Sequence, residues 1–112
     1  MTADRYAPRI HQVADYVTAN LTDALSLSHL AGVAGFSDFH FHRIFKQYTG
    51  ENLNAFVVRK RLERATQLMR VTPRLLLTDI ALACGFESSS DYSRAFKRQY
   101  GLAPSAWDRL TP

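Results

Sequence analysis

The sequence predicts an all-α protein of about seven helices, in which two helix-turn-helix units are joined by a long central helix. Three observations support this fold class. Apolar residues recur at spacings of three and four along the chain and never alternate as they would in a strand. A segment of about fifty residues occurs twice. In each copy, two short apolar stripes end at a glycine, which permits the left-handed turn that follows a helix.

The two copies correspond residue by residue. LSLSHLAGVAGF at residues 25–36 matches LLLTDIALACGF at residues 75–86 in two leucines, one alanine, the glycine and the phenylalanine, and Ala34 stands over Cys84. One additional residue, Glu87, follows in the second copy, and the match resumes at Ser88. A match of this length with a single insertion indicates a duplicated structural unit.

The expected helices of the first half follow in chain order. The opening amphipathic helix has an apolar face made of Ile10, Val13, Ala14, Val17 and Leu21. The first repeat contributes one stripe closed by Gly35 and one closed by Gly50. Their members are Leu27, Leu30, Ala31 and Ala34, then Phe41, Ile44, Phe45 and Tyr48. An alanine four residues before the turn glycine allows the two helices to cross closely.

A long central helix comes next and stops before Pro73. Its apolar residues are Phe56, Leu62, Ala65, Leu68 and Met69, and the face that we expect to be exposed carries Arg59, Lys60, Arg61 and Arg64. The second repeat contributes the stripes Leu77, Ile80, Ala81 and Cys84, then Tyr92, Ala95 and Phe96. A short last helix from Pro104 to Leu110, anchored by Trp107, completes the set.

These elements predict three parts of the chain. The opening helix and the first helix-turn-helix unit occupy residues 1–52, the linking helix residues 53–72, and the second unit residues 73–112. At 112 residues the chain can bury a core, although each half alone would be marginal.

The composition favours a polyanionic partner. Fourteen Lys and Arg against ten Asp and Glu give a net charge of +4, which suits nucleic acid. A single cysteine, Cys84, cannot form an internal disulfide, as is usual in a reducing compartment. No signal sequence and no apolar run of membrane-spanning length occur, so we expect a soluble cytoplasmic protein that does not bind a membrane.

The stretch FSDFHFHRIF, at residues 36–45, raises the question of a metal site. On a helix, His40 and His42 lie about 200° apart, whereas two metal ligands need a spacing of three or four on one face. We therefore expect no metal and interpret both as polar surface histidines. Phe39 instead points away from the core beside Arg43, as suits a contact in a DNA groove. The alternatives are that it covers a neighbouring helix or is an isolated surface aromatic.

The second repeat presents matching cations. Arg94 and Lys97 correspond to Arg43 and Lys46, but serines surround them. Shared cations with different neighbours are what two modules reading different base sequences would need. The alternative is a solvated charged face that recurs by duplication alone.

Two other classes of function compete with DNA binding. The basic face of the central helix could dock an acidic protein partner. An enzyme could use Cys84 as the nucleophile of an alkyl transfer. Because Cys84 takes the inward position that Ala34 has in the first copy, with no base beside it, we expect no enzyme activity.

At these residues the chain resembles the DNA-binding domain of the AraC/XylS family of bacterial transcription regulators. The motifs are LSLSHLAGVAGFSDFHFHRIFKQYTG, RLERA at residues 61–65, and DIALACGFESSSDYSRAFKRQYG followed by Ala103-Pro104. The resemblance covers nearly the whole chain. It implies two homeodomain-like units whose recognition helices enter successive major-groove segments of double-stranded DNA, commonly in an activator of transcription.

The resemblance also implies site residues. The base-reading positions would be Phe39, His42 and Arg43 in the first unit and Ser89, Ser90, Ser93 and Arg94 in the second. Helix starts at Asn52-Leu53 and at Ala103-Pro104 would offer N–H groups to phosphates. Lys46 and Lys97 would add positive charge, and no cofactor is implied.

Partners follow from the same resemblance. Double-stranded DNA is the principal one, RNA polymerase is a contact of activators, and family members usually carry an effector-binding or dimerisation domain, which nothing in these residues resembles. We expect this chain to be either a piece cut at a linker or a stand-alone regulator. It would bind as a monomer to an asymmetric site, in the bacterial cytoplasm and at the nucleoid when bound.

Three departures from the family pattern affect these expectations. Leu76 stands where a hydroxyl cap is usual, so we expect Thr78 to cap that helix instead. His29 stands where a glutamate commonly closes a capping box. The base-reading positions of the second unit are mostly small serines, which weakens the base contacts expected there.

Overall fold

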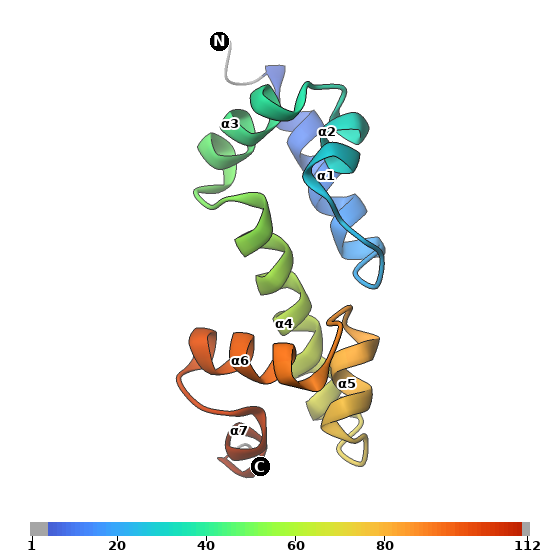
Figure 1. Ribbon diagram of the computed structural model, residues 1–112, viewed down its shortest axis with the longest axis vertical. Coiled ribbons are helices and arrows are strands. Elements are labelled where there is room, and N and C mark those ends of the chain that lie inside the picture. The colour runs from blue at the N-terminus through green and yellow to red at the C-terminus, as the bar shows by residue number, and fades with distance from the viewer. Residues whose placement is uncertain (1–4, 111–112) are drawn as a thin grey trace. The chain divides into compact units, whose positions relative to one another are not determined.

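The computed structural model describes residues 5–110, and within that range it contains seven α-helices and no strand (Figure 1). They are α1 (Ala7–Ala19), α2 (Leu27–Ala34), α3 (Asp38–Thr49), α4 (Leu53–Val71), α5 (Leu77–Ala83), α6 (Ser89–Tyr100) and α7 (Pro104–Leu110). The all-α class is confirmed. The pairs α2–α3 and α5–α6 are the two expected helix-turn-helix units.

The chain forms two compact units, one ending at Val57 and one beginning at Val58. Each has its own apolar core. The helix α4 contributes to both, because Leu53 and Phe56 are buried in the first core and Leu62 and Met69 in the second. The central helix is therefore part of each unit's core as well as the connection between them.

In the first unit, α1, α2 and α3 pack against one another. Phe45 is fully buried, and its ring lies 5.5 Å from that of Phe41 and 5.2 Å from that of Phe56, between ring centroids. Leu21 lies beyond the end of α1, outside the helix in which we expected it, but still packs against this core. These aromatic contacts join α3 to the start of α4.

In the second unit, α6 packs against both α5 and α7. The ring of Phe96 lies 5.7 Å from Tyr92 and 5.8 Å from Trp107, so Trp107 anchors α7 as the sequence predicted. The Tyr92 hydroxyl donates to the sulfur of Met69 at 3.4 Å, which ties α6 to α4. The duplicated positions Phe45 and Phe96 thus hold equivalent places in the two cores.

The same turn connects the two helices of each pair. Gly35 and Gly85 have positive φ angles of 76° and 98°, in the left-handed region that favours glycine. The following phenylalanine N–H donates to the carbonyl of Ala31 in the first unit, at 2.9 Å, and of Ala81 in the second, at 3.0 Å. This bond closes the last turn of the helix. The turn predicted from the repeat is confirmed in both copies.

Three of the helices begin at a serine. The hydroxyls of Ser26, Ser37 and Ser88 accept a hydrogen bond from the N–H three residues later, at 3.2, 3.3 and 3.1 Å. The start of α5 differs, because it follows Leu76, which makes no side-chain cap. The prediction that Thr78 caps this helix is wrong. Leu76 has an extended backbone and is the residue directly before the helix, so Thr78 lies inside α5. Burial of Ile80 and Ala81 therefore has to stabilise this helix.

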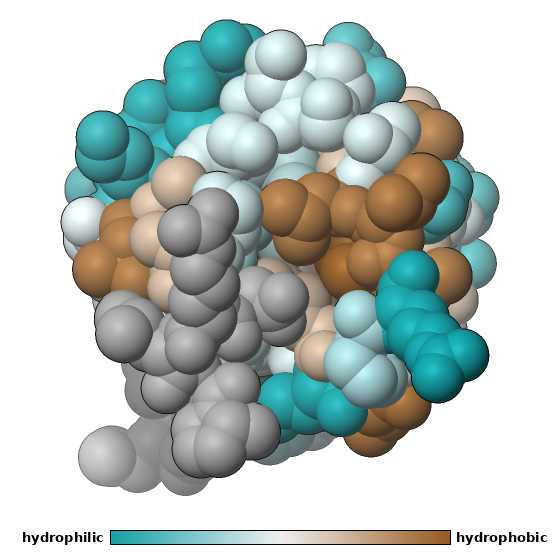
Figure 2. All heavy atoms as spheres, turned by 90° about the horizontal axis from the view of Figure 1, so that it is seen from below, coloured by the Kyte–Doolittle hydropathy of each residue, from teal (hydrophilic) through white to brown (hydrophobic). Residues whose placement is uncertain are grey.

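The second unit also has an exposed apolar surface. Its members come from the end of α4, the following segment and α5: Val71, Leu75, Leu76 and Leu82. Figure 2 views the molecule from below Figure 1 and shows hydrophobic residues gathered over part of that side. None of the four belongs to α3 or α6, so this surface is distinct from the second helices of the two pairs.

Replacing Phe45 with alanine should lower the free energy of unfolding of the first unit by about 3–5 kcal/mol, since a buried ring is lost and a cavity remains. The matched control is Phe39→Ala, the same change at a side chain that is 73% exposed, which should change it by less than about 0.5 kcal/mol. Denaturant unfolding followed by helical circular dichroism measures both. An equal loss in the two variants would contradict the burial of Phe45.

Candidate nucleic-acid interface

The outward face of α3 carries the residues that the sequence singled out. Burial of Phe41, Ile44 and Phe45 on one side fixes which residues point outward. Phe39 is 73% exposed, and the guanidinium carbon of Arg43 lies 5.9 Å from the centre of its ring. His42, Arg43 and Lys46 are exposed as well. The four predicted residues of this helix therefore share solvent-facing positions.

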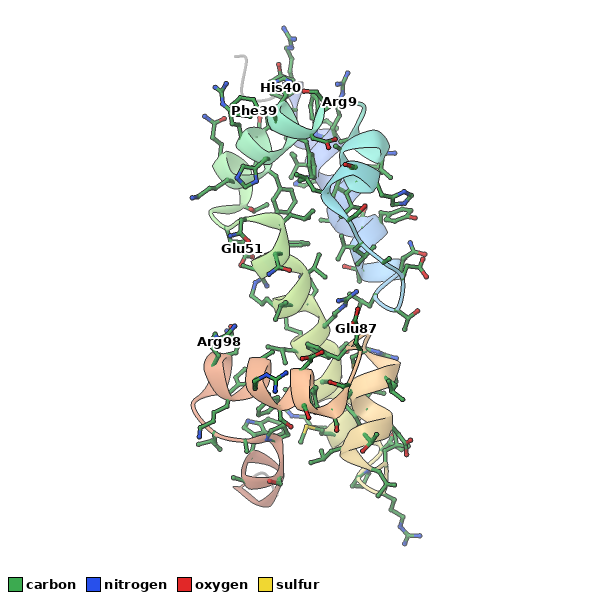
Figure 3. The ribbon with its side chains drawn as sticks, viewed as in Figure 1. Arg9, Phe39, His40, Glu51, Glu87 and Arg98 are labelled. Atoms are coloured by element: carbon green, nitrogen blue, oxygen red, sulfur yellow. The ribbon has the colours of Figure 1, made fainter. Side chains whose placement is uncertain are left out.

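His40 has a different environment. It is half-buried, and its ring lies 4.9 Å from Phe36 and 5.6 Å from Tyr6, both edge to face. The guanidinium of Arg9 lies 5.0 Å from the Phe36 ring, and Figure 3 shows Arg9, Phe39 and His40 at the same end of the first unit. The interpretation as a polar surface histidine fits His42 but is wrong for His40. Its aromatic neighbours on α1 and in the turn could not be identified from local spacing.

The α6 face is more polar and only partly exposed. Arg94, Lys97 and Ser90 are exposed, whereas Ser89 and Ser93 are half-buried. Arg94 donates from Nη2 to Oδ1 of Asp91, three residues earlier, at 2.5 Å. Asp91 is not among the residues predicted from the sequence. Its spacing from Arg94 is the signal that could have identified it, because residues three apart on a helix are neighbours.

The two helix starts offer backbone groups rather than side chains. At α4, the side-chain oxygen of Asn52 accepts from the Ala55 N–H at 2.8 Å, while the Leu53 side chain is buried. At α7, Pro104 is fully buried and has no N–H. Its start can therefore present only the N–H groups of Ala103 and of residues after the proline.

The basic face of α4 is less available than expected. Arg59 and Lys60 both pair with Glu63, at 3.0 and 3.4 Å. Burial lowers the pKa of Arg61, partly offset by the negative charge of Glu87. Of the four basic residues expected on an exposed face, Arg64 alone is exposed and the other three are half-buried. The expectation of a fully exposed basic face was wrong, because Glu63 pairs with two of these residues and Arg61 is half-buried near Glu87.

Cys84 belongs to the second core. It is fully buried, and burial raises the pKa of its thiol from 9.0 to about 11, with the nearby charge of Arg64 acting in the opposite direction. Its thiolate is therefore scarce at neutral pH, which disfavours a nucleophilic role.

The described residues offer neither a metal site nor a membrane-spanning helix. Among residues 5–107, no three histidine, cysteine, aspartate or glutamate side chains are placed together to hold a metal ion. No helix in this range combines the length and the apolarity needed to cross a membrane. The two histidines of α3 also differ in their surroundings, because His40 packs against aromatic rings and His42 is exposed.

The arrangement is suited to a polyanion that also presents hydrogen-bonding base edges, as double-stranded DNA does. Each pair places an exposed arginine and an exposed lysine three residues apart on its second helix. Arginine can contact guanine O6 and N7 with two hydrogen bonds, and lysine neutralises phosphate as a point charge. The two units offer the same cations among different neighbours.

Comparison with known proteins agrees with this geometry. Residues 30–110 match the family model described as a helix-turn-helix domain. The chain is 36% identical over 94 residues to the Right origin-binding protein of Escherichia coli strain K12, which covers 84% of this chain and 32% of that protein. The chain thus spans about a third of the length of this curated relative.

Solved structures share the fold. The DNA-binding domain of AdpA, a global transcriptional factor solved in complex with a target DNA, has a TM-score of 0.84 at 26% identity over 90% of each chain. A transcriptional regulator from Chromobacterium violaceum, of the AraC-type DNA-binding domain-containing proteins, has a TM-score of 0.83 at 30% identity over 92% of this chain and 90% of that one. The chain therefore belongs to the AraC-type family of helix-turn-helix DNA-binding domains.

Proposed function

We propose that this chain binds a specific sequence of double-stranded DNA as the DNA-binding domain of a transcription regulator, with α3 and α6 entering successive major-groove segments. The observation that carries the proposal is the pair of exposed cations at matching positions of the duplicated unit, Arg43 and Lys46 on α3, Arg94 and Lys97 on α6. The AdpA domain of similar fold, described in complex with a target DNA, supports it.

Base reading is assigned to the outward residues of the two helices. Arg43 and Arg94 would each contact a guanine, Phe39 a thymine methyl, and His42 a neighbouring base edge. On α6 the serine hydroxyls of Ser89, Ser90 and Ser93 would donate or accept. Since two of these serines are half-buried, Ser90 and Arg94 are the principal readers of the second unit.

Phosphate contacts are assigned to charges and helix starts. Lys46 and Lys97 lie in the last turns of α3 and α6 and would each neutralise a phosphate. The start of α4, at Asn52 and Leu53, and the start of α7, at Ala103 and Pro104, would present N–H groups to the backbone. Because Pro104 has none, the donors at α7 would be those of Ala103 and Ser105.

The difference between α3 and α6 makes the proposed site asymmetric. One chain carries two unlike readers, so a monomer would fill a site of about 20 base pairs without a second copy. A contact with RNA polymerase, control by an effector-binding domain and association with the nucleoid belong to the proposal for a whole regulator. The proposed role is binding without catalysis, in which Cys84 is a packed core residue.

Selection of bound duplexes from a random DNA library at about 150 mM salt should yield an asymmetric motif. We expect two informative blocks about ten base pairs apart, one for each recognition helix. A single block would mean that one unit only grips the backbone. No enrichment at all would refute sequence-specific binding by this chain.

Replacing Arg43 or Arg94 with alanine should each weaken binding to the selected duplex by about 1–3 kcal/mol and relax the base preference in one block only. Titration against duplexes mutated in either block measures this. Arg74→Ala, at an exposed arginine outside both recognition helices, is the control and should leave the preference intact. A uniform loss across all sequences would instead identify the replaced arginine as a phosphate contact.

The Cys84 thiol should react slowly with a thiol reagent at neutral pH and rapidly once the protein is unfolded. The folded pKa of about 11 lies above the ordinary 9.0. The raised pKa therefore contributes its full stabilisation to the folded state at a pH below 9.0. This stabilisation is lost as the pH rises from 9.0 to about 11. Labelling followed by mass measurement tests the first statement, and unfolding across that pH range the second. Rapid labelling of the native protein would reopen a nucleophilic role.

A further inference from the structure

The two recognition helices hold their matching arginines by different means. Arg43 lies against the ring of Phe39, an uncharged neighbour. Arg94 is held by the carboxylate of Asp91. In the register of the repeat, Asp91 corresponds to His40, whose ring instead packs against Tyr6 and Phe36. Among the described residues, an acid paired with the arginine of the second helix is therefore found in the second unit and not in the first.

Asp91 occupies a fixed position near the start of α6. Its N–H donates to the hydroxyl of Ser88 at 3.1 Å, which fixes the backbone of this turn. The helix dipole favours a negative charge here. The Asp91 side chain is 48% exposed and that of Arg94 66%, so the pair is open to a partner. It lies towards the end of the helix that recognition helices use to contact base edges.

Such a pair changes how an arginine meets DNA. An unpaired guanidinium can bond any phosphate, and phosphate contacts carry no sequence information. A carboxylate that accepts from Nη2 holds the planar group in one orientation and offsets its charge, while leaving its other N–H groups for an acceptor. The free energy that Arg94 contributes by binding a phosphate is then smaller. The free energy that it contributes by binding a guanine in the matching orientation is larger.

We infer that Asp91 is a positioning residue for specificity, which orients Arg94 for guanine and restrains it from binding phosphates of unrelated DNA. The inference rests on the proposed DNA binding. It accounts for how α6, whose other readers are small serines, can discriminate between sequences. The acid acts through Arg94, so its effect requires that arginine.

The test compares the affinities of wild-type and variant chains for two duplexes: the selected one, and one in which the block read by α6 is scrambled. Asp91→Asn keeps the size of the side chain but removes its charge. The ratio of the affinity for the selected duplex to that for the scrambled duplex should fall about two- to fivefold, because the pair is half-exposed, mostly through tighter binding of the scrambled duplex. In an Arg94→Ala background, the same substitution should leave the ratio unchanged.

Asp79→Asn is the matched control. It removes one exposed acid from the first turn of α5 in the same unit, and should tighten binding to both duplexes alike. Trp107 fluorescence, which reports on packing against Phe96 of α6, verifies that the variants are folded. An unchanged ratio in Asp91→Asn, an equal fall in Asp79→Asn, or an effect that persists without Arg94 would overturn the inference alone. A wild-type ratio near one would show that α6 reads no bases and would overturn the inference, while sequence-specific binding through α3 would stand. Failure of the selection to enrich any duplex is the result that would refute the proposed function itself.

Discussion

The close crossing of two helices at a left-handed glycine is the constraint on which both units depend. Gly35 and Gly85 take positive φ. Four residues before each of them lies an alanine with no exposed surface, Ala31 or Ala81. A larger side chain at either alanine would separate the helices, and a residue with a Cβ at either glycine would be strained. Because this turn sets how the second helix leaves the first, it also decides which face of that helix meets solvent.

Burial also decides which residues of each second helix face outward. In α3 the buried residues Phe41 and Phe45 lie on one side, so Arg43 between them in sequence must lie on another. The same relation holds in α6 between Tyr92, Phe96 and Arg94. The residues suited to contact DNA are therefore the ones that are not buried in the core. Their positions on each helix follow from the packing of the buried residues.

The duplicated units have diverged at their surfaces rather than in their cores. Phe45 and Phe96 hold equivalent aromatic clusters, and the serine caps at Ser37 and Ser88 are alike. Around the shared arginines, however, one unit places an aromatic ring and the other a carboxylate. Conserving the packing while changing the outward neighbours is a physical route by which one fold can read two unlike base sequences with a single chain.

The sequence alone determined the helices, their terminating glycines and the outward position of Phe39 and Arg43, because spacing, turn chemistry and the repeat are local properties. Only the tertiary structure decided the rest. His40 packs in an aromatic cluster because Tyr6 and Phe36 reach it from other segments. Arg61 is half-buried, and the charge near it is that of Glu87, from the segment before α6. Burial and partners brought from distant segments cannot be read from periodicity, since they depend on how the helices pack together.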